Sequence, residues 1–266
     1  MKKQVIIEGI LLALLFLVTW IGLAQVDWLR ILKVETVTSK TEKKLGDIFL
    51  ETFKKSDQEI NNLQVTRGID SIVQHICHAN GIDFNRIKTH VLLNDQVNAF
   101  ALPDGHLVIY TGLISKVANQ EELTGVICHE IAHIELHHVM KKLIKEIGLS
   151  VLISLGSGNA SGEILRESTK LLSSSAYDRK LEKEADIKAV DYLIQAQINP
   201  DHFANFLDRL SENDDRMYAY LGWINTHPDA KERAKYITSY SHSKGNRYLK
   251  ILSDTGWQAL RDGALR

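Results

Sequence analysis

The segment at residues 129–133, with the sequence HEIAH, constrains this chain more than any other. No proline interrupts its flanks, and apolar residues recur every three or four positions, so the segment is expected to be helical. On a helix, His129 and His133 share one face and can bind one metal ion. Glu130 then lies beside the ion, where it can take a proton from a water molecule that the ion activates.

A catalytic zinc ion needs a third protein ligand besides the two histidines. In metzincin peptidases it is a histidine six residues further on, but that position is Val139. A later helix offers carboxylates instead, because Glu182 and Asp186 are spaced to share one helix face. We expect Glu182 to bind the metal and Asp186 to hold a ligand histidine by its other ring nitrogen.

Glu184 is rotated by about 200° from Glu182 on a helical wheel and is expected to point away from the metal. The alternative for this segment is a solvent-exposed charged helix, since Lys180, Lys183 and Lys188 are spaced for ordinary ion pairs. The HEIAH segment upstream favours the metal site over that alternative.

Four segments in collinear order resemble the zinc metallopeptidases of the HtpX and CAAX-prenyl-protease type, above all their single-domain members from the bacterial envelope. These segments are residues 98–106 (NAFALPDGH), the HEIAH segment, residues 179–186 and Thr226-His227-Pro228 with Arg233 downstream. The resemblance runs from about Ile69 to Ile237. It departs at Asp104, where many relatives have glycine, and this difference should alter only a turn.

The resemblance implies a gluzincin-like metallopeptidase domain that binds one zinc ion per chain. His129, His133 and Glu182 are then the zinc ligands, and Glu130 is the catalytic base. Asp186 is a supporting or proton-donating acid. The implied function is hydrolysis of peptide bonds in unfolded or misassembled envelope proteins, with assembly factors of the envelope as partners. A prenyl-protein protease is disfavoured, because that role goes with multiple membrane spans missing here.

His227 precedes Pro228, which keeps it out of helical geometry. In relatives the matching histidine lies close to the zinc. We expect His227 either to occupy the fourth metal position and keep the enzyme latent, or to donate a hydrogen bond to the oxyanion formed during attack. The alternative is a helix-capping histidine on the surface.

Residues 97–102 and 107–111 predict a hairpin around the turn at residues 103–106. The first strand is expected at the sheet edge near the zinc, where an extended peptide can add as a further strand. Together with the resemblance, which carries most of the weight, this predicts that Asn98, Ala99 and Phe100 bind substrate. The alternative is a hairpin with a structural role alone.

Elsewhere the pattern is mostly helical, with one strand at residues 87–93. Helices are predicted at residues 36–63, 67–79, 119–147, 151–155, 163–195, 200–213 and 228–240. The fold is expected to be α+β and mainly helical, with a small antiparallel β-sheet beside the HEIAH helix. Cys77 and Cys128 are expected to be packed thiols rather than a disulfide.

The N-terminus carries the location signal. Lys2 and Lys3 precede an apolar run over residues 5–26, which lies between the lengths of a signal peptide and a membrane span. We expect an uncleaved anchor at residues 1–33, followed by a metallopeptidase domain at residues 34–266. The basic start places the catalytic domain outside the cytoplasm, in the periplasm. A cleaved signal peptide, and so a secreted periplasmic protein, is the alternative.

The charge of the chain argues against a nucleic-acid partner, and two kinds of function remain. The formal net charge is −1 and no basic run appears, so a nucleic-acid partner is not expected. The first function is a zinc endopeptidase acting on protein substrates. The second is a non-catalytic, chaperone-like binding protein in which zinc only stabilises the fold. Glu130 favours the first, since a structural zinc site has no use for a base.

Overall fold

The computed structural model describes residues 34–211, 222–241 and 248–265, with a few positions between residues 11 and 19. The chain divides into two compact units, Met1–Lys40 and Thr41–Arg266, and the second holds every residue of the predicted site. Within the described ranges, no helix combines the length and the apolar character that a membrane span requires. The predicted anchor and the boundary after residue 33 fall largely outside these ranges and stay predictions.

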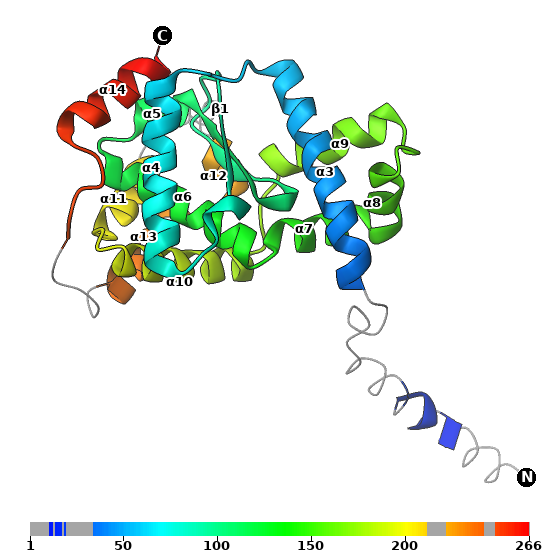
Figure 1. Ribbon diagram of the computed structural model, residues 1–266. Helices are drawn as coiled ribbons and strands as arrows, with labels where there is room; N and C mark the ends of the chain where they lie inside the picture. Colours follow the sequence, from blue (N-terminus) through cyan, green and yellow to red (C-terminus); the bar gives the residue numbers. More distant parts are fainter. Residues whose placement is uncertain are drawn as a thin grey trace, which may run out of the picture. The chain divides into compact units, whose positions relative to one another are not determined.

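The described part of the chain is α+β and mainly helical, as predicted (Figure 1). Its helices are α3 (Val34–Ser56), α4 (Leu63–Asn80), α5 (Thr111–Lys116), α6 (Gln120–Glu135), α7 (His138–Ile147), α8 (Leu149–Gly156), α9 (Gly162–Ser174), α10 (Arg179–Gln195), α11 (Asp201–Ser211), α12 (Gly222–Thr226), α13 (Ala230–Ser241) and α14 (Asp254–Ala264). Its strands are β1 (Lys88–Leu92), β2 (Ala99–Ala101) and β3 (His106–Tyr110), with short 3-10 turns η1 (Phe84–Arg86) and η2 (Pro103–Gly105).

The three strands form one sheet in the order β1-β3-β2. The predicted hairpin is confirmed, because β2 pairs with β3 in antiparallel register, Ala99 opposite Ile109. The prediction of a purely antiparallel sheet is wrong, since β1 runs parallel to β3, with Lys88 opposite His106.

The connection from β1 to β2 explains the mixed sheet. It crosses the end of β3, where the Asn94 N–H donates to Thr111 Oγ1 and the Gly112 N–H donates to Asn94 O. A Cβ on Gly112 would lie 2.3 Å from Asp95 O, so only glycine permits this close crossing. The crossing leaves β2 on the far side of β3, at the edge of the sheet.

The turn between β2 and β3 contains Asp104 in the left-handed conformation, with φ 61°. Glycine adopts this conformation without strain, whereas an aspartate there is less common. Here Lys88 forms an ion pair with Asp104 across the turn.

Two predicted long helices are each interrupted. The helix predicted at residues 119–147 ends at Glu135, and α7 starts at His138 after His137 adopts a left-handed φ of 54°. Histidine enters this region more readily than most residues, but no glycine or proline marks the break. The helix predicted at residues 163–195 is interrupted between α9 and α10, where the Asp178 side chain caps α10 by accepting from the Lys180 N–H.

Three other helix ends can be compared with the predicted ones. The helix predicted to reach residue 63 ends at Ser56, because the chain then runs along the sheet and the Ile60 N–H donates to Val91 O. The last helix of the predicted set starts at Ala230 rather than residue 228. The helix predicted at residues 67–79 spans Leu63–Asn80 and ends at Gly81, which has a left-handed φ of 66°.

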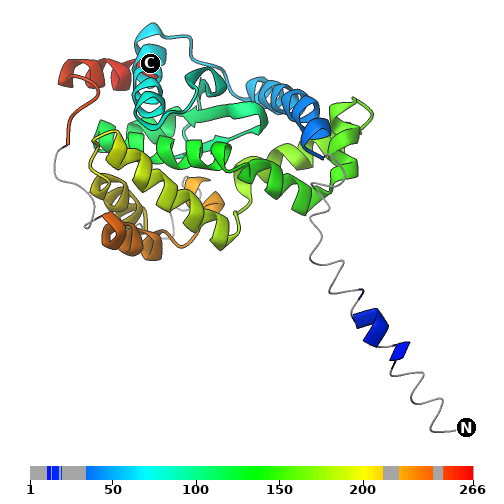
Figure 2. The ribbon, with the colours of Figure 1, turned by 60° about the horizontal axis from the view of Figure 1, so that its bottom comes forward.

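Helix α6 is the central element of the core. Helices α10 and α11 and strand β2 all pack against it, and α14 lies beside α4 (Figures 1 and 2). Most of α6 is buried, including the whole HEIAH segment. Cys77 and Cys128 are both buried and unpaired, as predicted.

Candidate metal centre

Four buried side chains direct their ligand atoms to one point. His129, His133, Glu182 and His227 each offer one atom, and these atoms all lie within 4.8 Å of one another. His129 Nε2 is 3.0 Å from His133 Nε2 and 3.2 Å from His227 Nδ1. Glu182 Oε1 lies 2.9 Å from His227 Nδ1 and 3.3 Å from His133 Nε2. The structure thus brings together the three predicted ligands and the histidine predicted beside them.

The spacing of these atoms fits a tetrahedral ion. Ligand atoms at the usual zinc distances stand about 3.3 Å apart. Burial lowers the pKa of His133 to about 4, even though Glu182 opposes the shift, so the ring is neutral. Lone pairs on two neutral imidazoles 3.0 Å apart repel each other unless a proton or cation lies between them. Three imidazoles and one carboxylate form a donor set that suits a divalent metal ion.

Three segments of the chain position the ligands. Helix α6 carries two of them one turn apart, α10 carries Glu182, and His227 follows the end of α12. The Asn119 side chain caps α6 by accepting from the Glu122 N–H. One turn before the first ligand, a Cβ on Gly125 would lie 2.5 Å from the Phe203 Cβ. Glycine at this position therefore lets α11 pack closely against α6.

Glu130 lies beside the four ligand atoms, where two hydrogen bonds hold it and His227 lies close by. The Ala101 N–H donates to its Oε2 at 3.1 Å, and the Trp223 indole N–H donates to its Oε1 at 3.3 Å. His227 Nε2 is 3.3 Å from the same Oε1. Burial raises the pKa of Glu130, but His227 and His133 outweigh burial and bring the pKa below its ordinary value. Glu130 is therefore an ionised proton acceptor in a fixed position.

Asp186 and Arg233 support the centre from outside. Asp186 Oδ1 is 2.9 Å from His129 Nδ1, on the side of the ring away from the other ligands. Arg233 donates to both oxygens of Asp186, at 2.8 and 2.7 Å, and the Tyr236 hydroxyl also donates to this carboxylate. Burial raises the pKa of Asp186, but Arg233 and His129 lower it to about 2. These contacts favour a supporting role for Asp186 over that of a proton donor.

Charge balance also favours a cation at the centre. Glu130, Glu182 and Asp186 are buried carboxylates, and the buried Arg233 forms ion pairs with two of them. These four residues together carry two negative charges, which a divalent ion would neutralise. Burial lowers the pKa of His227, but Glu182 and Glu130 raise it above the ordinary value. The surroundings of His227 thus stabilise a positive charge, whether a proton or a metal ion.

Aromatic residues cover the centre. Tyr177, between α9 and α10, stacks on His133 with ring centroids 4.1 Å apart. Trp223 stacks on His227 at 4.6 Å. Lys142 Nζ lies 4.2 Å from the centroid of the Tyr177 ring. The three histidines of the cluster are fully buried as a result.

The sequence analysis did not predict that Tyr177, Trp223 and His138 lie at the centre. His138 is buried, and its Nδ1 lies 3.1 Å from His133 Nδ1. On an uninterrupted helix, residues five apart point about 140° away from each other. The contact exists only because the helix breaks at His137, which itself is exposed. Tyr177 and Trp223 come from segments with no local signal for the site, so only the tertiary fold reveals them.

The residues predicted to bind substrate lie at the start of the edge strand. Asn98 is fully buried, and its side-chain N–H donates to Ser173 O in α9 at 3.3 Å. Ala99 and Phe100 are also buried, and the Phe100 ring packs against Phe53 with centroids 4.8 Å apart. The outer side of β2 faces the metal centre, since the Ala101 N–H points out of the sheet to Glu130.

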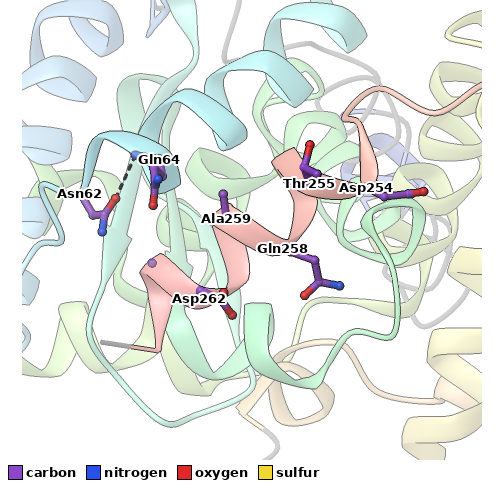
Figure 3. Close-up of a pocket in the computed structure, with 8 residues that line it drawn as sticks. Asn62, Gln64, Asp254, Thr255, Gln258, Ala259 and Asp262 are labelled. Carbon is purple, nitrogen blue, oxygen red and sulfur yellow. Dashed lines mark hydrogen bonds between the residues drawn. The ribbon is translucent and has the colours of Figure 1, made fainter.

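Two cavities show where the described surface is hollowed. One of about 140 Å³ reaches Glu182 and Arg233 beside the ion pair of Arg179 with Asp229. Another of about 550 Å³ lies between the start of α4 and α14 (Figure 3). Most of the residues that line it have polar side chains, among them Asn62, which caps α4, and none of the predicted site residues lines it.

Comparison with known proteins places these features in a family. The sequence profile of peptidase family M48 matches residues 63–241. The mitochondrial metalloendopeptidase OMA1 of Schizosaccharomyces pombe is 24% identical over 174 residues, which cover 65% of this chain and 52% of that relative. The beta-barrel assembly-enhancing protease of Yersinia pestis is 25% identical over 239 residues, covering 80% of this chain and 48% of the relative.

A third relative is metalloprotease LoiP of Escherichia coli, 28% identical over 172 residues, which cover 62% of this chain and 67% of LoiP. The chain spans about half the length of the first two relatives. The family profile covers most of the chain and includes all four residues of the buried cluster. The resemblance seen in the motifs is therefore confirmed, and this chain belongs to peptidase family M48.

Proposed function

We propose that this protein is a zinc-dependent metalloendopeptidase that hydrolyses peptide bonds in unfolded or misassembled envelope proteins. The observation that carries the proposal is Glu130, an ionised and buried carboxylate beside the four ligand atoms. A purely structural zinc site is closed by its ligands and has no use for such a base. Membership in peptidase family M48, and relatives that bear the names metalloendopeptidase and metalloprotease, support this reaction.

In this proposal, His129, His133 and Glu182 hold the metal, and Asp186 fixes the orientation of His129. A zinc ion held by these residues would supply Lewis-acid chemistry, polarising the substrate carbonyl and lowering the pKa of an adjacent water molecule. Glu130 accepts a proton from the attacking water and passes it to the leaving nitrogen. The Ala101 N–H keeps the carboxylate aimed at the centre during both transfers.

The edge strand β2 is the proposed docking site for an extended peptide. In the ladder with β3, the Tyr110 N–H donates to Asn98 O and the Leu102 N–H donates to His106 O. Because hydrogen-bonded pairs alternate along antiparallel strands, Ala99 and Ala101 direct their backbone groups outward. A peptide added there would lie next to Glu130 and would be recognised mainly through its backbone.

We expect Ala99→Pro to weaken peptide binding by about 2- to 10-fold, the effect of losing one backbone hydrogen bond. Proline removes an outward N–H but none of the ladder bonds to β3. Affinity for a fluorescent peptide, measured on the Glu130→Gln background to prevent turnover, gives the result. Metal content should be unchanged. Wild-type peptide affinity in this variant would mean that β2 has a structural role alone.

His227 is proposed to be a latch. The alternative of a surface capping histidine is wrong, because His227 is fully buried. Its Nδ1 lies 3.2 Å from His129 Nε2 and 2.9 Å from Glu182 Oε1, in the place of a fourth ligand. The same ring, stacked on Trp223, takes up the space that a substrate carbonyl needs. Opening the site therefore requires His227 and the covering Tyr177 to move.

We expect His227→Ala to raise the rate of casein digestion, because it frees the fourth metal position while leaving the other ligands in place. The initial rate per bound metal ion is the quantity to measure. A fall of about 10²–10³ would instead show that His227 stabilises the oxyanion. An unchanged rate would exclude both roles.

The setting of the reaction is proposed from the N-terminal sequence and from one relative. The basic start and apolar run of residues 1–33 support a single-pass inner-membrane protein whose catalytic domain faces the periplasm. The Yersinia pestis relative is named a beta-barrel assembly-enhancing protease. By analogy, we propose that envelope assembly factors are partners of this protein and that unfolded envelope proteins are its substrates.

A non-catalytic chaperone-like protein of the same fold is the competing proposal. Digestion of casein by the purified chain separates the two. A peptidase generates new amino termini in proportion to time and enzyme concentration, and a chelator stops the reaction. A binding protein leaves casein intact while still slowing its aggregation.

A further inference from the structure

The two predicted ligand histidines of α6 are supported in different ways. His129 Nδ1 contacts a carboxylate directly, that of Asp186. His133 Nδ1 contacts a second imidazole, with His138 Nδ1 at 3.1 Å. The other nitrogen of that ring, His138 Nε2, lies 3.3 Å from Glu184 Oε2. The two imidazoles are therefore in hydrogen-bonding contact, and the Glu184 carboxylate, which is 43% exposed, lies near the second of them without forming a hydrogen bond to it.

The protons on the two imidazoles are fixed once His133 binds a metal. A metal ion bound at Nε2 would use the lone pair of that nitrogen, so His133 would carry its proton on Nδ1. His133 Nδ1–H would then donate to His138 Nδ1, which must be unprotonated. His138 would consequently carry its proton on Nε2, the nitrogen that lies 3.3 Å from Glu184 Oε2.

Local backbone geometry brings the two imidazoles together. Helix α6 ends at Glu135, and His137 turns the backbone through a left-handed residue with φ 54°. Helix α7 then starts at His138, whose ring lies with its centroid 5.0 Å from that of His133. Without the break, His138 would lie on another face of the helix. The turn at His137 thus allows His133 and His138, five residues apart in sequence, to contact each other directly.

We propose that His138, with the Glu184 carboxylate near its far nitrogen, acts as a relay that fixes the tautomer and ring orientation of His133 for metal binding. The inference rests on the proposed role of His133 as a metal ligand. His138 is a positioning residue that acts through His133. Carboxylate partners of ligand histidines usually act directly, and their loss lowers metal affinity by about 10- to 100-fold. Here one imidazole transmits the effect.

The test is metal affinity of the full-length protein, stripped of metal and titrated with Zn²⁺ against a chromophoric chelator. His138→Leu should lower the affinity by about 10- to 100-fold. His138→Asn should recover most of it, because its side-chain oxygen can accept from His133 Nδ1–H. Glu184→Ala should keep stoichiometric metal and lower the affinity less, since water can replace an exposed carboxylate. Visible absorption of bound Co²⁺ should change with His138→Leu, which reports the ligand geometry.

His106→Leu is the matched control, because His106 is also buried but contacts His90 rather than the centre. Failure of the wild type to bind Zn²⁺ or Co²⁺ would overturn the proposed metal function itself. Tight binding and an unchanged Co²⁺ spectrum in His138→Leu would overturn the relay alone. Equal losses in His138→Leu, His138→Asn and His106→Leu would trace the effect to general destabilisation and also overturn the relay.

Discussion

Replacing Glu130 by glutamine should lower the rate of casein digestion by about 10²–10⁴, the usual contribution of a positioned general base. The amide oxygen can still accept the Ala101 N–H that now donates to the carboxylate at 3.1 Å, although the amide NH2 group cannot accept the Trp223 indole N–H. It cannot accept a proton from water near neutral pH. None of the four ligand atoms changes, so the variant should still bind one metal ion per chain.

Initial rates at saturating casein, divided by the metal content of each preparation, measure this effect. Glu135→Gln is the matched control, because Glu135 lies on the same helix but outside the cluster. It should digest casein at the wild-type rate. Digestion by Glu130→Gln at the wild-type rate would mean that Glu130 is not the base.

Loss of a ligand should have the second large effect. His133→Ala or Glu182→Ala should abolish stoichiometric metal binding, and casein digestion with it. Each change removes one of the atoms gathered within 4.8 Å, and loss of Glu182 also leaves Arg233 with one fewer carboxylate partner. Glu184→Ala should retain the metal, because Glu184 is half-exposed and lies outside the cluster.

Metal content after gel filtration, measured by mass spectrometry, tests this prediction. Circular dichroism of each variant beside the metal-free wild type separates a lost ligand from a lost fold. Equal metal loss in Glu182→Ala and Glu184→Ala would contradict the assignment of Glu182 from its helix face. Full metal content in His133→Ala would contradict the role of the HEIAH segment.

Within the site, sequence periodicity predicted which side chains share one face of the same helix. His129 and His133 on α6, and Glu182 and Asp186 on α10, share faces because each pair is spaced by four residues. The Asp186 contact with a ring nitrogen follows from the same spacing once the two helices pack together. The position of His227 came from resemblance to a family, since its own segment shows only turn chemistry.

Other features depend on tertiary contacts and carry no local signal. Periodicity continued through residues 136–137, so the break that brings His138 to the centre was missed. The mixed sheet depends on a crossing at Gly112, which requires a close approach to Asp95 that no strand pattern records. Tyr177 and Trp223 cover the site from segments that are distant in sequence, so their contacts exist only in the folded chain.

If a single divalent ion in the buried cluster supports peptide hydrolysis, activity must follow metal content. Metal analysis of the purified full-length protein, combined with casein digestion before and after metal removal, is the decisive measurement. We expect one zinc ion per chain, loss of digestion when a chelator removes it, and recovery when one equivalent of Zn²⁺ is restored. Undiminished digestion by protein shown to be free of metal would rule out a metal-dependent peptidase.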